Sequence, residues 1–209
     1  MARSEALGRV KEGYTTGARR LAARSMGSLA RTRVTPNALT AGGVLLCAAA
    51  AVVVYFEDRG EIRAFWIGAA LFIVGSLLDI LDGALARTSG RATPFGAFVD
   101  SMTDRVSEGL ILGAIALIFM RDGNEIALAL TFAAAVGSFL VSYARAKAEI
   151  LGLRGDVGIG GRAERVVVIS AGLILAPWGA LQWAIYLLAA TVWLTVLQRL
   201  LHVRKQLHG

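Results

Sequence analysis

Long apolar stretches separated by short polar segments run through this chain from residue 36 to residue 201. A stretch of about 20 apolar residues is long enough to cross a bilayer as a helix. The pattern predicts six such helices, with a Pro-Trp-Gly turn at 177–179 between a short fifth helix and the sixth. The predicted ranges are 36–56, 64–85, 95–120, 126–148, 163–175 and 181–201. The expected fold is therefore all-α, a polytopic membrane protein with six transmembrane helices.

The composition supports this prediction. Hydrophobic residues make up 56% of the 209 residues, and only three prolines are present. Such a composition is typical of an integral membrane protein rather than a soluble domain. The single cysteine, Cys47, cannot form an internal disulfide, and the sequence has no zinc-ligand spacing.

The amino-terminal segment differs from the rest of the chain. Its first 33 residues carry eight Lys or Arg residues. From 1 to about 26 we predict a basic amphipathic helix lying on the membrane surface, the alternative being a disordered basic tail. The chain is thus divided into a juxtamembrane arm, residues 1–34, and one six-helix domain, residues 35–209.

The positive charges are strongly biased along the chain. All but three of the 22 Lys and Arg residues lie in the arm, in the segments 87–105 and 145–165, or at the carboxy-terminal end. The exceptions, Arg59, Arg63 and Arg121, lie in loops that also hold acids. The positive-inside rule then predicts a multi-pass protein of the cell membrane with both termini cytoplasmic. The net charge of +7 suits anionic lipids and anionic substrates. No nucleic-acid-binding motif is present, so nucleic acid is not an expected partner.

Four aspartates stand where the second and third apolar stretches meet. Asp79, Asp82, Asp100 and Asp104 fall within 26 residues. Residues three or four apart share a helix face, so the four acids form two stripes that can face one another. Ionisable groups within membrane spans are costly, which makes them candidates for function. We expect them to bind one or two hard divalent metal ions, the alternative being acids that cap helices or pair with arginines of the same segment.

The predicted depth of these acids suggests a reaction. A metal ion at the cytoplasmic ends of two spans can meet a phosphate whose lipid tails stay in the bilayer. Mg²⁺, or Mn²⁺ in its place, commonly binds one or two carboxylates together with substrate phosphates, and two ions can neutralise both the attacking and the leaving oxygen. Asp104 is the deepest acid in the third span and is a candidate general base. Glu108, one turn further on, would support it, the alternative being a buried acid that pairs with Arg105 or with a basic residue elsewhere.

The acidic motif also resembles a known signature. Asp79-x-x-Asp82-Gly83-x-x-Ala86-Arg87, followed by Gly96-x-x-x-Asp100-x-x-x-Asp104, resembles the CDP-alcohol phosphotransferase family at every fixed position of its signature. The resemblance covers residues 35–199 and implies a six-helix membrane fold, usually a homodimer. It also implies transfer of a substituted phosphate from a CDP-linked lipid to an alcohol, with release of CMP.

The resemblance assigns roles to individual residues. It implies that Asp79, Asp82 and Asp100 bind metal, and that Asp104 is both a ligand and the catalytic base. The family also has a Pro-Asn-x-x-Thr segment near the nucleotide, which matches Pro36 to Thr40 here. The nucleotide site implied by the resemblance consists of Asn37, Thr40, Asp79, Asp82, Gly83, Ala86, Arg87 and Gly96.

A basic cluster between the fourth and fifth stretches bears on the acceptor. Arg162 and Arg165 are three residues apart, and guanidinium forks suit phosphate oxygens. We therefore expect an anionic acceptor, the alternative being ordinary positive charge on a cytoplasmic loop. The segment resembles that of bacterial phosphatidylinositol phosphate synthases and their archaeal counterparts. The acceptor-phosphate site implied by this resemblance consists of Ser142, Arg145, Lys147, Arg162, Arg165 and Arg199.

Two departures from that pattern concern the acceptor and not the family. The basic pair at 145 and 147 is Arg then Lys, where the reverse order is expected, and Gly160-Gly161 replaces an Ala-Glu pair. The preferred hypothesis is transfer of a phosphatidyl group from a CDP-diacylglycerol-like lipid to a hydroxyl of inositol phosphate. Glycerol 3-phosphate is the alternative acceptor, but the related enzymes that use it usually carry an Arg where residues 41–45 are uncharged. Two other classes are a membrane prenyltransferase, which has more spans, and a cation transporter, whose acids would lie nearer the bilayer centre.

Overall fold

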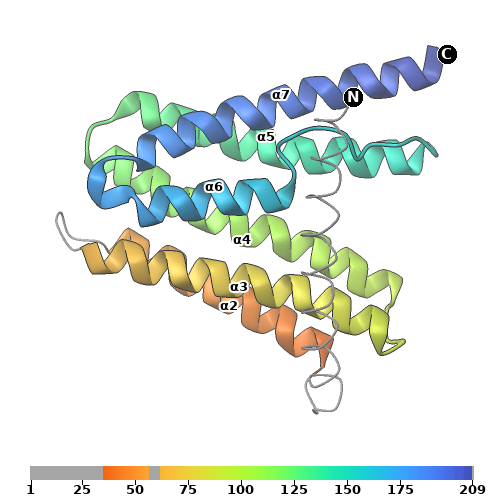
Figure 1. The fold of residues 1–209 in the computed structure, drawn as a ribbon, viewed down its shortest axis with the longest axis horizontal. Coiled ribbons are helices and arrows are strands. Elements are labelled where there is room, and N and C mark those ends of the chain that lie inside the picture. Colours follow the sequence, from red (N-terminus) through yellow and green to blue (C-terminus); the bar gives the residue numbers. More distant parts are fainter. Residues whose placement is uncertain (1–34, 57–61, 209) are drawn as a thin grey trace, which may run out of the picture.

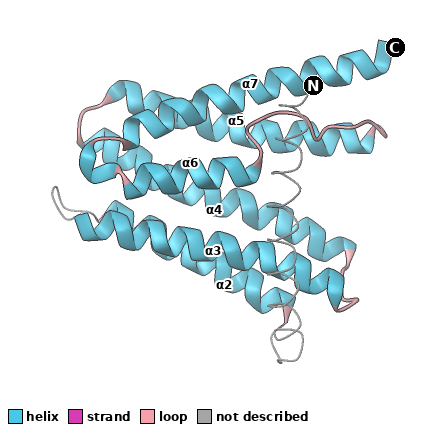
Figure 2. Ribbon diagram, viewed as in Figure 1, coloured by secondary structure: helices cyan, strands magenta, loops and turns pink. Residues whose placement is uncertain are grey.

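The computed structural model describes residues 35–56 and 62–208, and within these ranges it is helical without strands (Figures 1 and 2). The predicted surface helix of the arm lies outside the described residues. The helices are α2 (Pro36–Tyr55), α3 (Ile62–Thr88), α4 (Pro94–Arg121), α5 (Glu125–Ile150), α6 (Arg162–Ile174) and α7 (Leu181–His208), with a 3₁₀ turn at Ala176–Trp178. The all-α prediction is confirmed, and each predicted apolar stretch corresponds to one helix.

The largest difference from the predicted ranges is at the end of α7. The apolar stretch ends at residue 201, whereas the helix continues to His208. The added residues include no proline or glycine, and basic residues in a last helical turn interact favourably with the helix dipole. Within the described ranges, four helices, α2, α3, α5 and α7, are long and apolar enough to cross a membrane by length and composition alone. The acids in the first half of α4 and the 13 residues of α6 distinguish these two helices from the others.

Local sequence explains where two of the site helices begin. The Thr35 hydroxyl accepts a hydrogen bond from the Ala38 backbone N–H at 3.2 Å, and the Thr93 hydroxyl accepts one from that of Gly96 at 2.9 Å. A proline follows each threonine and occupies the first helical position. Proline suits this position because its missing N–H would have no partner there.

The helices pack in a closed ring. Going round it, each helix contacts the next in the order α2, α3, α6, α7, α5, α4 and back to α2, while α3 and α4 touch only slightly (Figure 1). The ring encloses an apolar core that includes Phe72, Ile111, Ile115, Ile169 and Leu188, each at most 1% exposed. The order brings α6 against α3, although two helices separate them in the chain.

Two glycines allow α2 and α3 to approach closely. A Cβ atom at Gly75 would lie 2.8 Å from the Gly43 carbonyl oxygen, and one at Gly43 would lie 2.9 Å from the Gly75 carbonyl oxygen. Small residues at crossings let membrane helices come into backbone contact. The crossing lies one turn from Asp79, and it therefore sets how α2 meets the acidic end of α3.

Candidate active site

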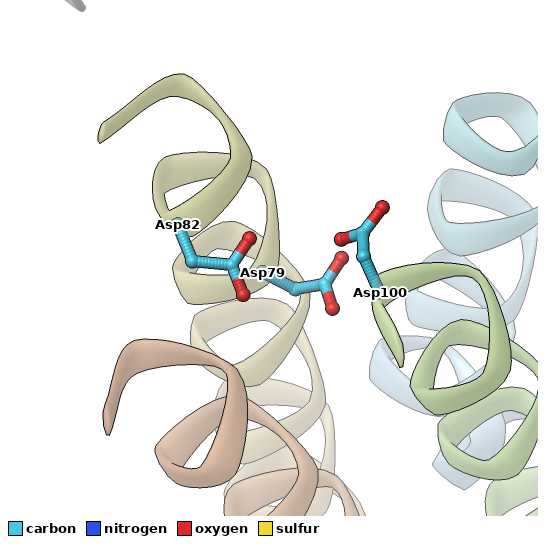
Figure 3. A group of neighbouring side chains, drawn as sticks. All are labelled: Asp79, Asp82 and Asp100. Atoms are coloured by element: carbon cyan, nitrogen blue, oxygen red, sulfur yellow. The ribbon is translucent and has the colours of Figure 1, made fainter. Parts of the chain in front are cut away.

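Three carboxylates come together between α3 and α4. Asp79 and Asp82 project from α3 toward Asp100 on α4 (Figure 3). One oxygen from each of the three lies within 4.8 Å of the others. Asp79 and Asp82 are only 6% and 3% exposed. This is a compact set of hard oxygen ligands of the kind that Mg²⁺ and Mn²⁺ prefer.

The hydrogen bonds of Asp82 show that a cation fits this set. One carboxylate oxygen, Oδ2, accepts a short hydrogen bond from the Thr40 hydroxyl on α2. The other, Oδ1, is buried and has no hydrogen-bond partner among the described residues. A buried carboxylate oxygen without a partner is costly, and a coordinated metal ion removes that cost. The three acids therefore fit a divalent metal ion.

The fourth aspartate has a different partner. Asp104 stands outside the group of three acids, and its Oδ1 forms an ion pair with Arg162 Nη2 at 2.5 Å. The other guanidinium nitrogen, Nη1, makes a closer ion pair with Asp79 Oδ2. Arg162 is the first residue of α6, and the packing of α6 against α3 places it beside the acids. Its side chain is 30% exposed.

Arg165, one turn further along α6, is bound differently. Its guanidinium pairs with both oxygens of Glu108 on α4, at 2.7 and 2.8 Å, and donates to the Gly160 carbonyl oxygen at 3.0 Å. Arg165 and Glu108 are 4% and 8% exposed. The sequence left open whether Glu108 pairs with Arg105 or with a basic residue elsewhere. The structure pairs it with Arg165, which is distant in the chain. Arg105 instead contacts Ser101, whose hydroxyl lies 2.7 Å away.

The loop before α6 is attached to α7. Arg199 donates to the Val157 carbonyl oxygen at 2.9 Å and, from Nη1, to that of Val141 on α5. The Thr195 hydroxyl accepts from the Gly160 backbone N–H at 2.8 Å. At Gly158, φ is +114° and a Cβ atom would lie 2.3 Å from the Thr195 methyl carbon, so glycine is required there. These contacts fix the residues that lead into Arg162.

The other predicted site residues differ in exposure. Arg145 is paired with Glu149 at 2.8 Å, and both side chains are 56% exposed. The Gly96 backbone N–H is used in the cap of α4. Gly96, Gly83, Ala86 and Ser142 are partly buried, whereas Asn37, Arg87 and Lys147 are exposed. Each of these residues thus keeps at least part of its surface open to a ligand.

Positive charge is concentrated at the end of the ring that holds the carboxylates. The amino-terminal ends of α2, α4 and α6 meet the carboxy-terminal ends of α3, α5 and α7 there (Figure 1). Of the Lys and Arg residues in the described ranges, only Arg63 and Arg121 belong to the opposite end. An anionic substrate is therefore drawn to the end that holds the acids.

Comparison with known proteins agrees with this geometry. Residues 33–197 match the family described as CDP-alcohol phosphatidyltransferase. The chain belongs to this family. It is therefore an integral membrane transferase, as the acidic motif predicted. Archaetidylinositol phosphate synthase of Pyrococcus horikoshii is 36% identical over 181 residues, covering 86% of this chain and 89% of that protein. Phosphatidylinositol phosphate synthase of Mycobacteroides abscessus is 34% identical, covering 85% and 80%.

Solved structures of another family member show the same fold. The crystal structure of Mycobacterium tuberculosis phosphatidylinositol phosphate synthase with CDP-DAG bound has a TM-score of 0.76 and 31% identity, over 88% of this chain and 94% of that one. The same enzyme in complex with manganese and citrate has a TM-score of 0.75 and 30% identity, over 87% and 88%. Family membership sets aside the prenyltransferase and transporter hypotheses.

Some contacts at the site were not predicted from the sequence. The sequence placed Thr195 in an apolar helix with no role, and it assigned Arg165 and Arg199 to a ligand rather than to protein acceptors. A partial signal existed, because Thr195 and Arg199 are four apart and so share one face of α7. The loop that they hold could not be placed without the fold.

The Arg165–Glu108 pair gives a stability prediction. Removing one partner of a buried ion pair leaves an uncompensated charge, which costs about 3–5 kcal/mol. We expect Glu108→Leu and Arg165→Leu each to lower the midpoint of thermal unfolding in detergent markedly, and the double variant to recover part of the loss. The exposed pair at Arg145 and Glu149 is the control, because such pairs contribute about 0–1 kcal/mol. Equal effects at both pairs would contradict the assignment.

Proposed function

We propose that this enzyme transfers a phosphatidyl group from a CDP-diacylglycerol-like lipid to a hydroxyl of inositol phosphate and releases CMP. The observation that carries the proposal is the placement of Arg162 beside the carboxylate cluster at the basic end of the ring. A cation that can bind an acceptor phosphate then stands next to groups that can hold a metal ion and a nucleotide diphosphate. Two relatives named above are an archaetidylinositol phosphate synthase and a phosphatidylinositol phosphate synthase, and a structure of the M. tuberculosis enzyme holds CDP-DAG.

Asp79, Asp82 and Asp100 would hold Mg²⁺ or Mn²⁺, and Asp104 would complete the ligands of a second ion. When bound, the metal neutralises charge on the diphosphate and on the leaving CMP oxygen. The manganese complex of the M. tuberculosis relative supports a divalent ion in this family. Thr40 would act through Asp82, because its hydroxyl already donates to that carboxylate.

Asp104 would take the proton from the acceptor hydroxyl. The hydroxyl oxygen then bonds to the phosphorus that carries the diacylglycerol, the bond from that phosphorus to the CMP oxygen breaks, and CMP leaves with the electron pair. Asn37, Gly83, Ala86, Arg87 and Gly96 would bind the nucleotide. The two glycines and Ala86 leave room close to the backbone, and Arg87 is exposed with its guanidinium near Gly83.

We assign binding of the acceptor phosphate to Arg162, together with Ser142, Arg145 and Lys147 on α5. Arg165 and Arg199, also predicted to bind this phosphate, have their guanidinium groups engaged by protein oxygens. We therefore propose that these two residues position the loop and α6, and so place Arg162. A hydrogen bond to a charged group contributes roughly 1.5–3 kcal/mol.

We further propose that all six helices cross the membrane, with both termini and the site on the cytoplasmic side, and that the chain forms a homodimer. The charge distribution supports the orientation, since the basic end of the ring is the end predicted to face the cytoplasm. α4 crosses despite its acids because Asp100 and Asp104 lie in its first half, near the surface, and Glu108 at its midpoint is paired with Arg165. The residues after Glu108 are apolar up to the last, Arg121.

The deciding experiment measures CMP release from CDP-diacylglycerol with a panel of acceptors. We expect inositol phosphate to react fastest, and free inositol to be a poor acceptor, because it offers no charge to Arg162. Preference for glycerol 3-phosphate would leave the family and chemistry intact and overturn the choice of acceptor. Equal reaction of free inositol and inositol phosphate would overturn the anionic site.

A further inference from the structure

We infer that Arg162 is a movable counterion that competes with the divalent metal ion for Asp79 and turns to the acceptor phosphate when the metal binds. The inference rests on the proposed function and concerns the order in which its site is filled. Asp79 is the residue that connects the two sets of contacts. It belongs to the three-carboxylate cluster, and it also forms an ion pair with Arg162.

The geometry makes joint occupation unfavourable. The Arg162 guanidinium contacts both Asp79 and Asp104, so it is paired with one of the three carboxylates of the cluster. A carboxylate oxygen in close contact with a guanidinium has less electron density to give to a metal ion. A divalent ion a few ångströms from the guanidinium would also repel it strongly at a half-buried site. Binding of one cation at Asp79 therefore weakens binding of the other.

Arg162 has more room to change partner than Arg165 has. The Arg162 side chain is 30% exposed and stands at the first position of α6. Arg165, one turn away, is held by both oxygens of Glu108 and by a backbone carbonyl, and its side chain is 5% exposed. The frame around Arg162 thus stays fixed while its own side chain changes partner. An anionic acceptor provides the new partner at the basic end of the ring.

This exchange couples the two substrate-binding events. Metal binding frees the guanidinium, and the guanidinium then adds to the affinity for the acceptor phosphate. Coupling between two binding sites is reciprocal, so bound acceptor must raise metal affinity by the same factor. The acceptor would bind weakly before the metal site is filled, which favours assembly of the metal and CDP-lipid first.

The test is Mn²⁺ binding to the purified full-length protein, measured by electron paramagnetic resonance without substrates. We expect Arg162→Gln to bind Mn²⁺ at least about tenfold more tightly than the wild type, since it removes a charged hydrogen-bonding competitor. Arg204→Gln, which removes the same charge from an exposed position near the end of α7, is the control for a general charge effect. Repeating the titration in 1 M salt screens distant charges but not a direct contact.

Each outcome decides. A tighter-binding Arg162→Gln variant whose advantage persists in 1 M salt supports the exchange. Equal affinities, or an advantage that disappears in salt or is matched by Arg204→Gln, would overturn it and leave the metal site standing. If neither the wild type nor Arg162→Gln binds Mn²⁺, both this inference and the metal role in the proposed function are overturned. A second titration with inositol phosphate present should tighten Mn²⁺ binding to the wild type far more than to Arg162→Gln; equal tightening would contradict the coupling.

Discussion

Replacing Asp79 by Asn is expected to reduce CMP release by at least about a hundredfold, because this side chain serves both cation sites. It stands in the three-carboxylate cluster and it also pairs with Arg162. Loss of a single electrostatic group that stabilises a transition state typically costs about 10²–10³ in rate. The substitution keeps the size of the side chain and removes its charge, so the fold should survive.

Two measurements check this result. CMP release is followed at saturating Mg²⁺, and Mn²⁺ binding is titrated separately, where we expect the Asp79→Asn variant to bind weakly. Asp122→Asn, at the far end of α4, is the matched control for an Asp-to-Asn change and should retain activity. Removal of metal with EDTA should abolish CMP release by the wild type, and added Mg²⁺ or Mn²⁺ should restore that activity. Full activity in the chelated enzyme would contradict the metal hypothesis.

Asp104→Asn is expected to cause the other large loss of activity, this time in turnover and not in CDP-lipid binding. If Asp104 accepts the proton of the attacking hydroxyl, its removal should lower turnover by about 10²–10⁴-fold. CDP-lipid should still bind, because the three-carboxylate cluster does not include Asp104. Single-turnover CMP release and equilibrium binding of the CDP-lipid separate the two effects.

Asp100→Asn is the comparison for that experiment. Asp100 belongs to the cluster, so this variant should lose metal binding and turnover together. Near-normal turnover of Asp104→Asn would show that Asp104 is not the base. Failure of that variant to bind CDP-lipid would show that it is chiefly a metal ligand.

Much of the fold could be predicted because the helices follow the pattern of hydrophobic residues along the chain. Each apolar stretch marks a helix, and residues such as Thr93 mark where a helix begins. The grouping of Asp79, Asp82 and Asp100 was also predictable, since helical spacing puts the α3 pair on one face. The facing of α3 and α4 was predictable as well, because acids that share a metal ion must lie close together.

The roles of the arginines could not be predicted in the same way. Positive charge along a sequence shows which end of a helix is basic, but a side chain finds its partner only in three dimensions. Arg162 and Arg165 differ by one helical turn, yet one reaches Asp79 and the other reaches Glu108. Which of them faces the acids depends on how α6 is rotated between α3 and α7. That rotation is set by the loop bound to Thr195 and Arg199.

The ring order has a consequence for biosynthesis. α3 and α4 are synthesised with their acids well before α6 brings Arg162, although the folded protein joins α3 directly to α6. An aspartate placed near the centre of a newly inserted helix costs about 2.5–3.5 kcal/mol, and less near the surface. We therefore expect α3 and α4 to insert together as a hairpin with their acidic ends kept in the hydrated headgroup layer. The nascent chain would reach its final depth only after α6 has left the ribosome and paired with Asp79.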